Sequence, residues 1–343
     1  MKVAFDISPI LTAHSSRGIG VYTKNLLKGL QKMNDIKIIP FENPKKPPEA
    51  DLIHYPYFDL FFHTLPIICK TPRVITVHDV IPLVFPNHFP SGKKGKVNLW
   101  FQKIALKNTQ GVICDSQTSK TDIESRLAYS PDKIYVAYLA AGESFKKVYD
   151  TKILNKTKRK YSLPEEYILY VGDVNWNKNV PNLLKAVQLS NRNLVLIGKS
   201  FTDDNLTQVK EINLLIDSLN LGNRVLKLGY VPDNDLANIY NMADITVVPS
   251  HYEGFGLPVI ESMACGTPVI CSNNSSLLEV GGEAAIYCNA NDPKDIGDKI
   301  NNFISSNKVK KEKIQKLTEK QATKFSWKST IEDIVKIYKT LSK

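Results

Sequence analysis

The stretch from Ala243 to Ala264 places the strongest constraint on the fold of this chain. Residues 243–250 form an apolar run closed by a proline and a serine, which is typical of a short buried strand. A Gly-X-Gly turn follows, and Pro258 then lies near the start of an apolar segment that fits a helix. A strand, a glycine turn and a helix start direct free backbone N–H groups toward one point, so the stretch predicts an α/β unit with an anion site.

Two carboxylates lie in this stretch, Glu253 in the turn and Glu261 about one helical turn into the predicted helix. Both can therefore border the same pocket. A carboxylate beside an anion site accepts hydrogen bonds from hydroxyl groups, so the pattern indicates a ligand that carries both phosphate and sugar. The alternative is an ordinary connecting turn in which Glu261 only complements the helix dipole.

The residues around the two carboxylates carry a family resemblance. The run Pro-Ser-X-Tyr-Glu-Gly-Phe-Gly-Leu-Pro-Val, with its continuation to Pro268, resembles the E-X7-E signature of the family 4 retaining glycosyltransferases. The resemblance is strong over 163–291 and looser over 1–150. It implies the GT-B fold, in which two Rossmann-like βαβ domains face each other across a deep cleft. It also implies a nucleotide-diphosphate sugar as co-substrate, with no cofactor and no metal ion.

Apolar strand-like runs separated by glycine turns recur along the whole chain, as in a doubly wound α/β protein. The lysine-rich, polar segment 152–162 ends near Pro164 and is typical of a linker. We therefore expect an N-terminal acceptor-side domain over 1–160 and a donor-binding domain over 161–325. By resemblance, the amphipathic helix at 326–343 returns to the first domain.

The resemblance assigns several residues to donor binding. Gly18 and Gly20 match the glycine loop that closes over the donor phosphates, and Lys178 matches a lysine that binds the diphosphate. The arginine that usually precedes this lysine is Asn177 here, so one expected positive charge is missing. Val231 lies in the segment whose backbone contacts the nucleotide base.

Three further residues are expected at the strand ends of the first domain. His78 and Asp79 follow a strand-like run, and Asp6 stands near the end of the first one. A histidine at such an edge is often structural, but its context resembles the family's histidine beside the donor sugar. Asp6 and Asp79 are weaker candidates for acceptor contacts.

The roles of these residues follow from the charge that develops during transfer. Departure of the leaving group places negative charge on the diphosphate, which Lys178 and the backbone amides near Gly18, Gly20 and Leu257 would stabilise. The resemblance implies that Glu253 binds the sugar hydroxyls and Glu261 the ribose hydroxyls. His78, Glu253 and Lys178 are therefore the predicted catalytic residues. The loop residues Phe255 and Gly256 complete the predicted donor site.

Asp233 and Asp235 have the spacing of the D-X-D metal motif found in the other large glycosyltransferase fold. Their context predicts a structural role instead, because they follow a Val-Pro pair and precede an apolar helical segment. We expect Asp233 to be the helix N-cap and Asp235 to lie in the first turn.

The net charge of +11 is concentrated in the first half of the chain. Residues 1–160 hold 25 Lys and Arg against 13 Asp and Glu, whereas residues 161–343 hold 20 against 21. Five dispersed cysteines without C-X-X-C spacing are typical of reduced thiols in a cytoplasmic protein. An electropositive half indicates an anionic partner or simply favours solubility.

Lysines interleave with apolar residues over 91–107. Two readings of this helix remain open. It lies on the inner face of an anionic membrane, or its apolar face covers the sheet while its lysines face water.

We expect a retaining hexosyltransferase that moves mannose from GDP-mannose to a glycan or a lipid-pyrophosphate-linked acceptor in polysaccharide synthesis. The choice of mannose rests on resemblance to bacterial mannosyltransferases, through the Arg-Gly-Ile-Gly and His-Asp-X-Ile-Pro runs. The alternatives are a UDP-sugar transferase of the same fold and a nucleotide-sugar epimerase. A nucleic-acid-binding protein is favoured only by the basic pI, and no recognised nucleic-acid module supports it.

Overall fold

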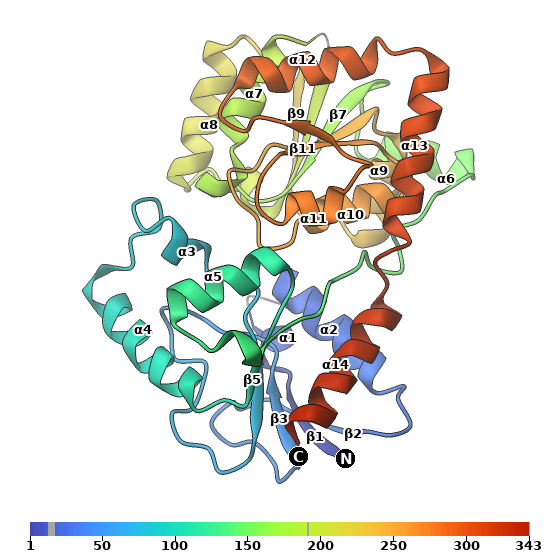
Figure 1. Cartoon of the computed structure of the whole chain (residues 1–343). Helices are drawn as coiled ribbons and strands as arrows, with labels where there is room; N and C mark the ends of the chain where they lie inside the picture. The colour runs from blue at the N-terminus through green and yellow to red at the C-terminus, as the bar shows by residue number, and fades with distance from the viewer. Residues whose placement is uncertain (13–17, 191, 343) are drawn as a thin grey trace. The chain divides into compact units, whose positions relative to one another are not determined.

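The computed structural model describes residues 1–12, 18–190 and 192–342. The chain divides into two units, Met1–Ala140 with Ser326–Lys343 and Ala141–Phe325 (Figure 1). Each unit is built around one parallel sheet of six strands. Two Rossmann-like sheets in series confirm the predicted fold class, whereas the cleft between the domains stays a prediction.

The sheet of the first unit has the strand order β2-β1-β3-β4-β5-β6. Its strands are β1 (Lys2–Asp6), β2 (Lys37–Phe41), β3 (Leu52–Tyr55), β4 (Arg73–Thr76), β5 (Gly111–Cys114) and β6 (Ile134–Val136). The inner strands are buried on both faces, which explains their continuous apolar sequences. Thr76 of β4 pairs with Ile113 of β5, so the residues that follow these two strands emerge at the same edge of the sheet.

Helices cover both faces of this sheet. Ala105 and Leu106 of α4 and Ile123 of α5 pack into a core on one face, while α2 and α14 lie together on the other. The helical elements are α1 (Ser8–Leu11), α2 (Gly18–Leu30), α3 (Ile81–Val84), α4 (Gly92–Lys107), α5 (Gln117–Leu127), the 3-10 turn η1 (Pro131–Lys133) and α14 (Trp327–Leu341).

The sheet of the second unit has the strand order β12-β11-β10-β7-β8-β9. Its strands are β7 (Tyr167–Val171), β8 (Asn193–Ile197), β9 (Val225–Leu228), β10 (Ile245–Val248), β11 (Val269–Ser272) and β12 (Ile286–Cys288). The chain order reverses direction between β7 and β10, which are neighbours. Ligands of open α/β sheets bind at the carboxyl ends of strands at such a switch point.

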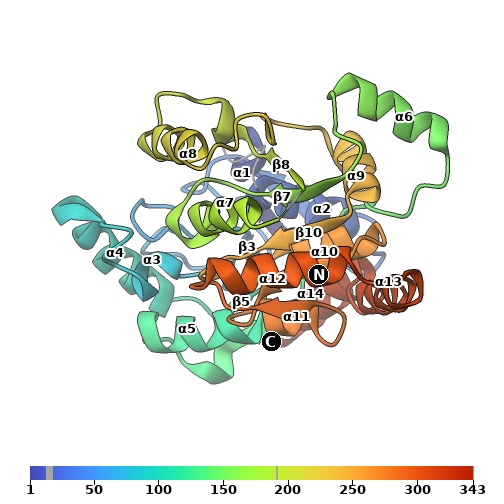
Figure 2. The same ribbon diagram turned by 90° about the horizontal axis from the view of Figure 1, so that it is seen from above.

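Helices also form a layer on each face of the second sheet. Helices α7, α8 and α12 enclose one core, with α7 and α12 side by side in Figure 2, and α9 packs into another core. The helical elements are α6 (Thr151–Lys160), η2 (Trp176–Lys178), α7 (Val180–Gln188), η3 (Lys199–Thr202), α8 (Thr207–Ser218), α9 (Asp233–Met242), α10 (Leu257–Ala264), α11 (Leu277–Gly281), α12 (Pro293–Ile304) and α13 (Lys308–Ala322).

The segment that was expected to be a linker is a helix that belongs to the second unit. Asp150 caps α6 by accepting a hydrogen bond from the Lys152 amide at 2.8 Å. On the facing helix α9, Asn238 donates to Thr157 at 3.0 Å and Asp235 pairs with Lys160 at 2.6 Å. The predicted boundary at 160 is therefore wrong, because these contacts attach residues 141–160 to the second unit.

The C-terminal helix α14 belongs to the first unit. The Tyr338 hydroxyl lies 2.5 Å from Nδ1 of the fully buried His54 on β3. Ile331 packs so closely on Gly29 that a Cβ there would lie 1.9 Å from its Cδ1, so a larger residue at this position of α2 would force the Ile331 side chain to move. Thr330 also donates to the Tyr138 carbonyl at 2.6 Å. Side chains far apart in sequence thus attach the end of the chain to the first sheet.

Two further observations bear on the class of protein. All five cysteines are free thiols, and four of them are buried. Across residues 1–12, 18–190 and 192–342, none of the helices combines the length and the apolar character needed to cross a membrane.

Candidate active site

The loop that follows β7 places Lys178 at the carboxyl edge of the second sheet. The short turn η2 ends at Lys178, and Asn179 then adopts φ +57°, a left-handed conformation that asparagine tolerates well. The Asn179 side-chain amide donates to the carbonyls of Pro249 and Ala290, at 2.8 and 2.7 Å. This buried side chain therefore joins the Lys178 loop to the end of β10.

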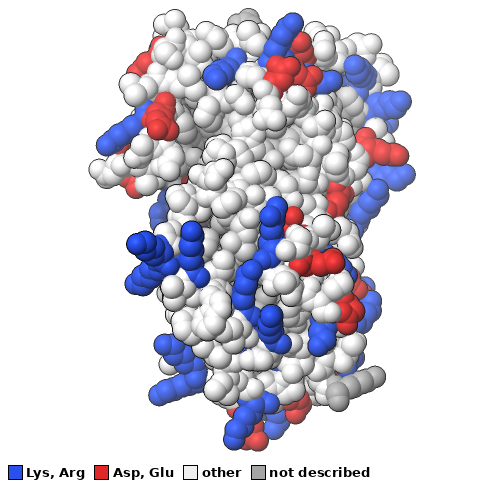
Figure 3. All heavy atoms as spheres, turned by 60° about the vertical axis from the view of Figure 1, so that its left-hand side comes forward, with Lys and Arg blue, Asp and Glu red and all other residues white. Residues whose placement is uncertain are grey.

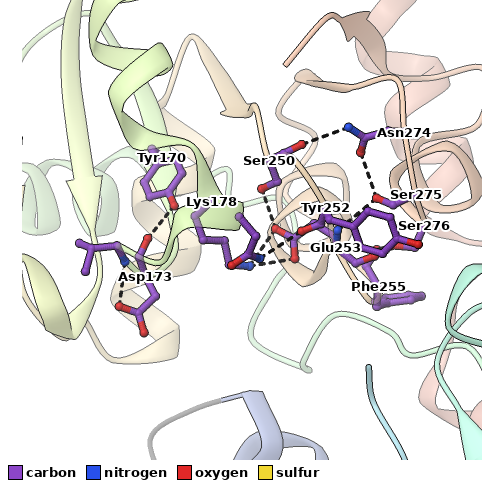
Figure 4. Close-up of polar contacts among 12 residues, drawn as sticks. Tyr170, Asp173, Lys178, Ser250, Tyr252, Glu253, Phe255, Asn274, Ser275 and Ser276 are labelled. Carbon is purple, nitrogen blue, oxygen red and sulfur yellow. Dashed lines mark hydrogen bonds and ion pairs between the residues drawn. The ribbon is translucent and has the colours of Figure 1, made fainter. Parts of the chain in front are cut away.

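Lys178 and Glu253 form a buried ion pair. The Lys178 Nζ lies 2.8 Å from both carboxylate oxygens of Glu253, and Ser250 donates to the same carboxylate at 2.7 Å (Figure 4). The Glu253 side chain is 7% exposed and that of Lys178 is 22% exposed. Two predicted site residues that are 75 positions apart in the chain are thus in direct contact.

The backbone around Glu253 is held by hydroxyl groups from the loop after β11. The Glu253 amide donates to Ser275 Oγ at 3.1 Å, and its carbonyl accepts from Ser276 Oγ at 2.9 Å. Ser276 Oγ also lies 2.9 Å from the Phe255 carbonyl. Figure 4 shows these serines on the side of Glu253 away from Tyr170. The turn is therefore held in place before any ligand binds, as electrostatic catalysis requires.

The glycine turn leads directly into α10. Gly256 is the N-cap residue with φ +101°, where glycine is strongly favoured, and a Cβ there would lie 2.8 Å from Leu277 Cδ2. Leu257 is the first helical residue and Pro258 the second. Phe255 is buried and makes an edge-to-face contact with Phe325. The expected helix start is present. Pro258 has no amide hydrogen and the Val259 amide donates to the Gly256 carbonyl at 2.9 Å, so Leu257 is the first-turn residue whose amide can face an anion.

Glu261 faces a different environment from Glu253. Its Oε2 accepts a hydrogen bond from the Tyr240 hydroxyl at 3.1 Å. Burial is the main cause that raises the pKa of Glu261 from 4.5 to about 7; the Tyr240 hydrogen bond lowers the pKa and the nearby charge of Asp233 raises it. The protonation of this carboxyl group therefore changes near neutral pH, whereas an ordinary glutamate is ionised there.

Val231 is buried in the core between the second sheet and α9.

Asp233 is the first residue of α9 and Pro232 is its N-cap, so the expected cap at Asp233 is wrong. Proline has no side-chain acceptor, and the acidic residues instead complement the dipole from within the first turn. Asp235 accepts hydrogen bonds from Lys160 and Tyr161, and the Lys160 bond lowers its pKa.

No set of three or more His, Cys, Asp or Glu side chains is arranged to hold a metal ion in the part of the chain that the structure describes.

Asn177 forms a contact between loops at the position where a positive charge was expected. Its buried side chain donates to the Tyr252 carbonyl at 3.1 Å, and its own carbonyl accepts from the His251 amide at 2.7 Å. Trp176 stacks on His251 with 4.7 Å between the ring centroids. Asn177 therefore holds the β7 loop against the Glu253 turn and contributes no charge.

The first unit holds the other predicted catalytic residue, His78. Its Nδ1 lies 2.7 Å from Asp115 Oδ2, and its ring packs edge-to-face on Tyr22 at 4.7 Å. His78 Nε2 and Asp115 Oδ1 are buried and have no hydrogen-bond partner within the described ranges. Burial lowers the pKa of His78, but the charge and hydrogen bond of Asp115 outweigh burial, so the pKa is raised overall.

The other predicted site residues of the first unit follow strands at the same edge of its sheet. Asp6 ends β1 and accepts bonds from the amide and hydroxyl of Ser8, and burial raises its pKa to about 6. Asp79 accepts from the Ile81 amide at 3.0 Å. Gly18 and Gly20 lie in the first turn of α2. Arg17, which precedes them in the motif, lies outside the described residues.

Sequence reasoning missed three side chains that contact the predicted residues. Ser250 was visible as the residue that closes the strand before Glu253. Asp115 follows β5, the strand next to the one that carries His78, so the shared sheet edge was a usable signal. Tyr240 lies in the last turn of α9, and nothing in the local sequence indicated its bond to Glu261.

Comparison with known proteins identifies related sequences over most of the chain. The profile described as glycosyl transferases group 1 matches residues 153–339, and that of glycosyltransferase family 4 matches 45–140. The chain is 32% identical to an Escherichia coli O-antigen chain mannosyltransferase B over 281 residues, which are 78% of this chain and 70% of that protein. It is 29% identical to the E. coli serotype-specific mannosyltransferase WbdA over 75% of this chain but only 32% of that protein.

Solved structures share the fold at lower sequence identity. Sucrose-phosphate synthase from Thermosynechococcus elongatus superposes with a TM-score of 0.78 at 19% identity, covering 99% of both chains. Anabaena HepE, solved in complex with UDP and glucose, superposes with a TM-score of 0.76 at 18% identity over 99% of this chain and 100% of that one.

Proposed function

Because the chain belongs to the group 1 and family 4 glycosyltransferases and is thus a retaining hexosyltransferase that uses a nucleotide sugar, we propose that it transfers mannose from GDP-mannose. The proposed acceptor is a glycan or a lipid-linked sugar in surface polysaccharide synthesis. The identity of 32% to an O-antigen mannosyltransferase supports the choice of sugar and of pathway class.

The observation that carries the proposed donor site is the buried contact between Lys178 and Glu253. A lysine ammonium has three donors, and the two Glu253 oxygens use two of them, so one remains for a diphosphate oxygen. An ionised carboxylate has about four acceptor positions, and Lys178 and Ser250 use three. The fourth is available to a sugar hydroxyl, so one pair can contact both halves of the donor.

The rest of the donor fits the same end of the second sheet. We propose that the first-turn amide of Leu257 and the dipole of α10 complement the diphosphate, because a helix N-terminus favours negative charge. Glu261 lies one turn further along α10 and would accept bonds from the ribose hydroxyls, which requires its ionised form. The base would contact the segment at Val231, and Phe255 and Gly256 would shape the turn.

His78 is the proposed group of the first unit beside the transferred sugar. Asp115 contacts the ring at Nδ1 and so fixes its orientation. The other ring nitrogen, Nε2, has no hydrogen-bond partner among the described residues, and we propose that it faces the donor. A positively charged or donating ring there stabilises the developing charge on the departing group. Gly18 and Gly20 would contribute amides to the phosphates, and Asp6 and Asp79 would contact the acceptor. We propose retention by front-face attack, without a covalent intermediate on the enzyme.

A UDP-sugar is the second candidate donor. Anabaena HepE, which shares the fold, was solved with UDP and glucose. The residues proposed to bind the diphosphate and the sugar serve either base, so the site chemistry does not separate the two candidates.

A donor panel tests the proposal. Purified protein is incubated with GDP-mannose, GDP-fucose, UDP-glucose and UDP-N-acetylglucosamine, and thermal stability and release of the nucleoside diphosphate are measured. We expect the largest stabilisation and release with GDP-mannose. A preference for a UDP-sugar would overturn the choice of donor but not the fold or the site.

A pair of variants tests the assignment of residues to the donor site. Glu253→Gln keeps the size of the side chain and removes the ion pair with Lys178, so donor turnover should fall by roughly 100-fold or more. Glu211→Gln, a change at an exposed glutamate of α8 outside the proposed site, is the matched control. Turnover that is equal in wild type and Glu253→Gln would refute the site.

A further inference from the structure

The outward side of α4 carries apolar side chains. Val97 and Trp100 are 55% and 59% exposed, and Ile104 follows at helical spacing on the same side. An amphipathic helix of a soluble domain normally turns such a stripe toward the core. In α4 the stripe faces away from the sheet.

The inward side of α4 is fixed by buried contacts. Gln102 is fully buried and donates to the Asp59 carbonyl at 2.7 Å and to Thr64 at 2.9 Å. Ala105 and Leu106 pack into the core of the first sheet. Rotating the helix to bury Trp100 would break both sets of contacts. The reading in which the apolar face of this helix covers the sheet is therefore wrong for Val97 and Trp100.

The loop 58–70 adds exposed apolar residues at both ends of α4. Phe62 and Ile68 are 68% and 87% exposed. Asn98 donates to the Phe61 carbonyl at 2.8 Å, and Asn108 donates to the Ile67 carbonyl at 3.2 Å. Helix and loop thus present one surface, which we call the α4 face: Phe62, Ile67, Ile68, Val97, Trp100 and Ile104 with the surrounding lysines.

The charge around these residues is almost all positive. Lys93, Lys94, Lys96 and Lys107 are exposed on α4, which contains no Asp or Glu. Asp59 and Asp79 are the only acidic residues between positions 58 and 114, and the Asp59 carboxylate accepts hydrogen bonds from the amides of Phe61 and Phe62. Figure 3, in which the side of the molecule that carries α4 comes forward, shows basic side chains gathered over the first unit.

We infer that the α4 face binds the surface of a bilayer that contains anionic lipids. A tryptophan flanked by aliphatic residues suits the boundary between headgroups and acyl chains, and lysines around it reach anionic headgroups. A nucleic acid would match the lysines but leave the aliphatic residues without a partner. The surface therefore fits a partner that is both anionic and apolar, as a lipid interface is.

Vesicle flotation of the full chain tests this inference. Vesicles of phosphatidylcholine alone are compared with an equal mixture of phosphatidylcholine and phosphatidylglycerol, at low and high salt. We expect binding to the anionic vesicles that weakens with salt. The triple variant Lys93→Gln, Lys96→Gln and Lys107→Gln should bind roughly 5-fold more weakly for each lysine, on the order of 100-fold in all. Trp100→Ala should bind about 10-fold more weakly.

Matched controls come from α13, an exposed helix of the second unit. Lys310→Gln, Lys313→Gln and Lys316→Gln remove the same charge, and Val309→Ser removes an apolar side chain that is 75% exposed. Both should bind vesicles as wild type does. Three results would overturn the inference. The protein could bind neutral vesicles as strongly as anionic ones, or the α13 controls could lose as much binding as the α4 variants. It could also bind RNA but not vesicles. Release of nucleoside diphosphate from the donor should be unchanged in every variant, which separates this inference from the donor site.

Discussion

Glu253 and Glu261 belong to one short stretch of sequence, yet they have opposite surroundings. Glu253 faces the ammonium group of Lys178 and the hydroxyl of Ser250, and most of its acceptor positions are filled by the protein. Glu261 accepts a hydrogen bond from the Tyr240 hydroxyl and lies near the charge of Asp233, and burial raises its pKa to about 7. Two carboxylates of one motif can thus differ in chemistry. Glu253 is held in a fixed ion pair, whereas the hydrogen bonds that Glu261 can accept depend on its protonation.

The largest expected effect comes from breaking the ion pair. Lys178→Ala leaves the Glu253 carboxylate buried without its counter-charge, which should lower the free energy of unfolding by about 3–5 kcal/mol. Donor turnover should fall by roughly 100- to 1,000-fold. The double variant with Glu253→Gln should recover most of the stability but none of the turnover, as measured by urea unfolding and release of nucleoside diphosphate. Full stability of Lys178→Ala alone would contradict this account.

The second effect isolates the titration of Glu261. The folded protein binds the Glu261 proton more tightly than the unfolded chain does, so this proton stabilises the fold. The stabilisation is fully present below pH 4.5 and is lost as the pH rises through about 7. The variant Glu261→Gln has no carboxyl group at this position, so its stability should not fall with pH for this reason. Between about pH 4 and about pH 8, wild type should lose about 3 kcal/mol relative to the variant. A constant difference across that range would show that Glu261 titrates normally.

A third carboxylate, Asp115, extends the comparison to the first unit. Like Glu253 it faces a cationic partner, but His78 can lose its charge. The raised pKa of His78 means that the pair stabilises the fold fully below pH 6.5, and that this contribution is lost as the pH rises through the raised pKa. Asp115→Asn should cost about 2 kcal/mol at low pH and less at high pH. NMR titration of His78 should show a lower pKa in the variant, and an unchanged pKa would refute the role of Asp115.

The smallest effect concerns the hydroxyl on Glu261. Tyr240→Phe removes one hydrogen bond, which should cost about 1 kcal/mol. Because that bond lowers the pKa of Glu261, the variant should raise it further and shift the pH dependence of stability upward. Tyr161→Phe, which removes a hydroxyl bonded to Asp235, is the control and should leave the titration of Glu261 unchanged. A pKa that stays near 7 in Tyr240→Phe would argue that burial alone sets it.

The local sequence determined much of the fold. Alternation of apolar runs, glycine turns and helical spacing predicted the strands and the helices that follow them, and α14 lies within the helix predicted over 326–343. These signals are local because backbone geometry and burial of one face act over a few residues. They also predicted that Lys178, His78 and Glu253 follow strands at the carboxyl edge of a sheet, where ligands of such folds bind.

Only the tertiary structure decided which side chains meet there. The contacts of Lys178 with Glu253, His78 with Asp115 and Tyr240 with Glu261 join residues 21 to 75 positions apart. The unit boundary moved from 160 to 140 because α6 found partners on α9. The apolar stripe of α4 faces outward because Gln102 is held on the inner side. In each case the deciding energy comes from packing and hydrogen bonding between distant segments, which local patterns do not encode.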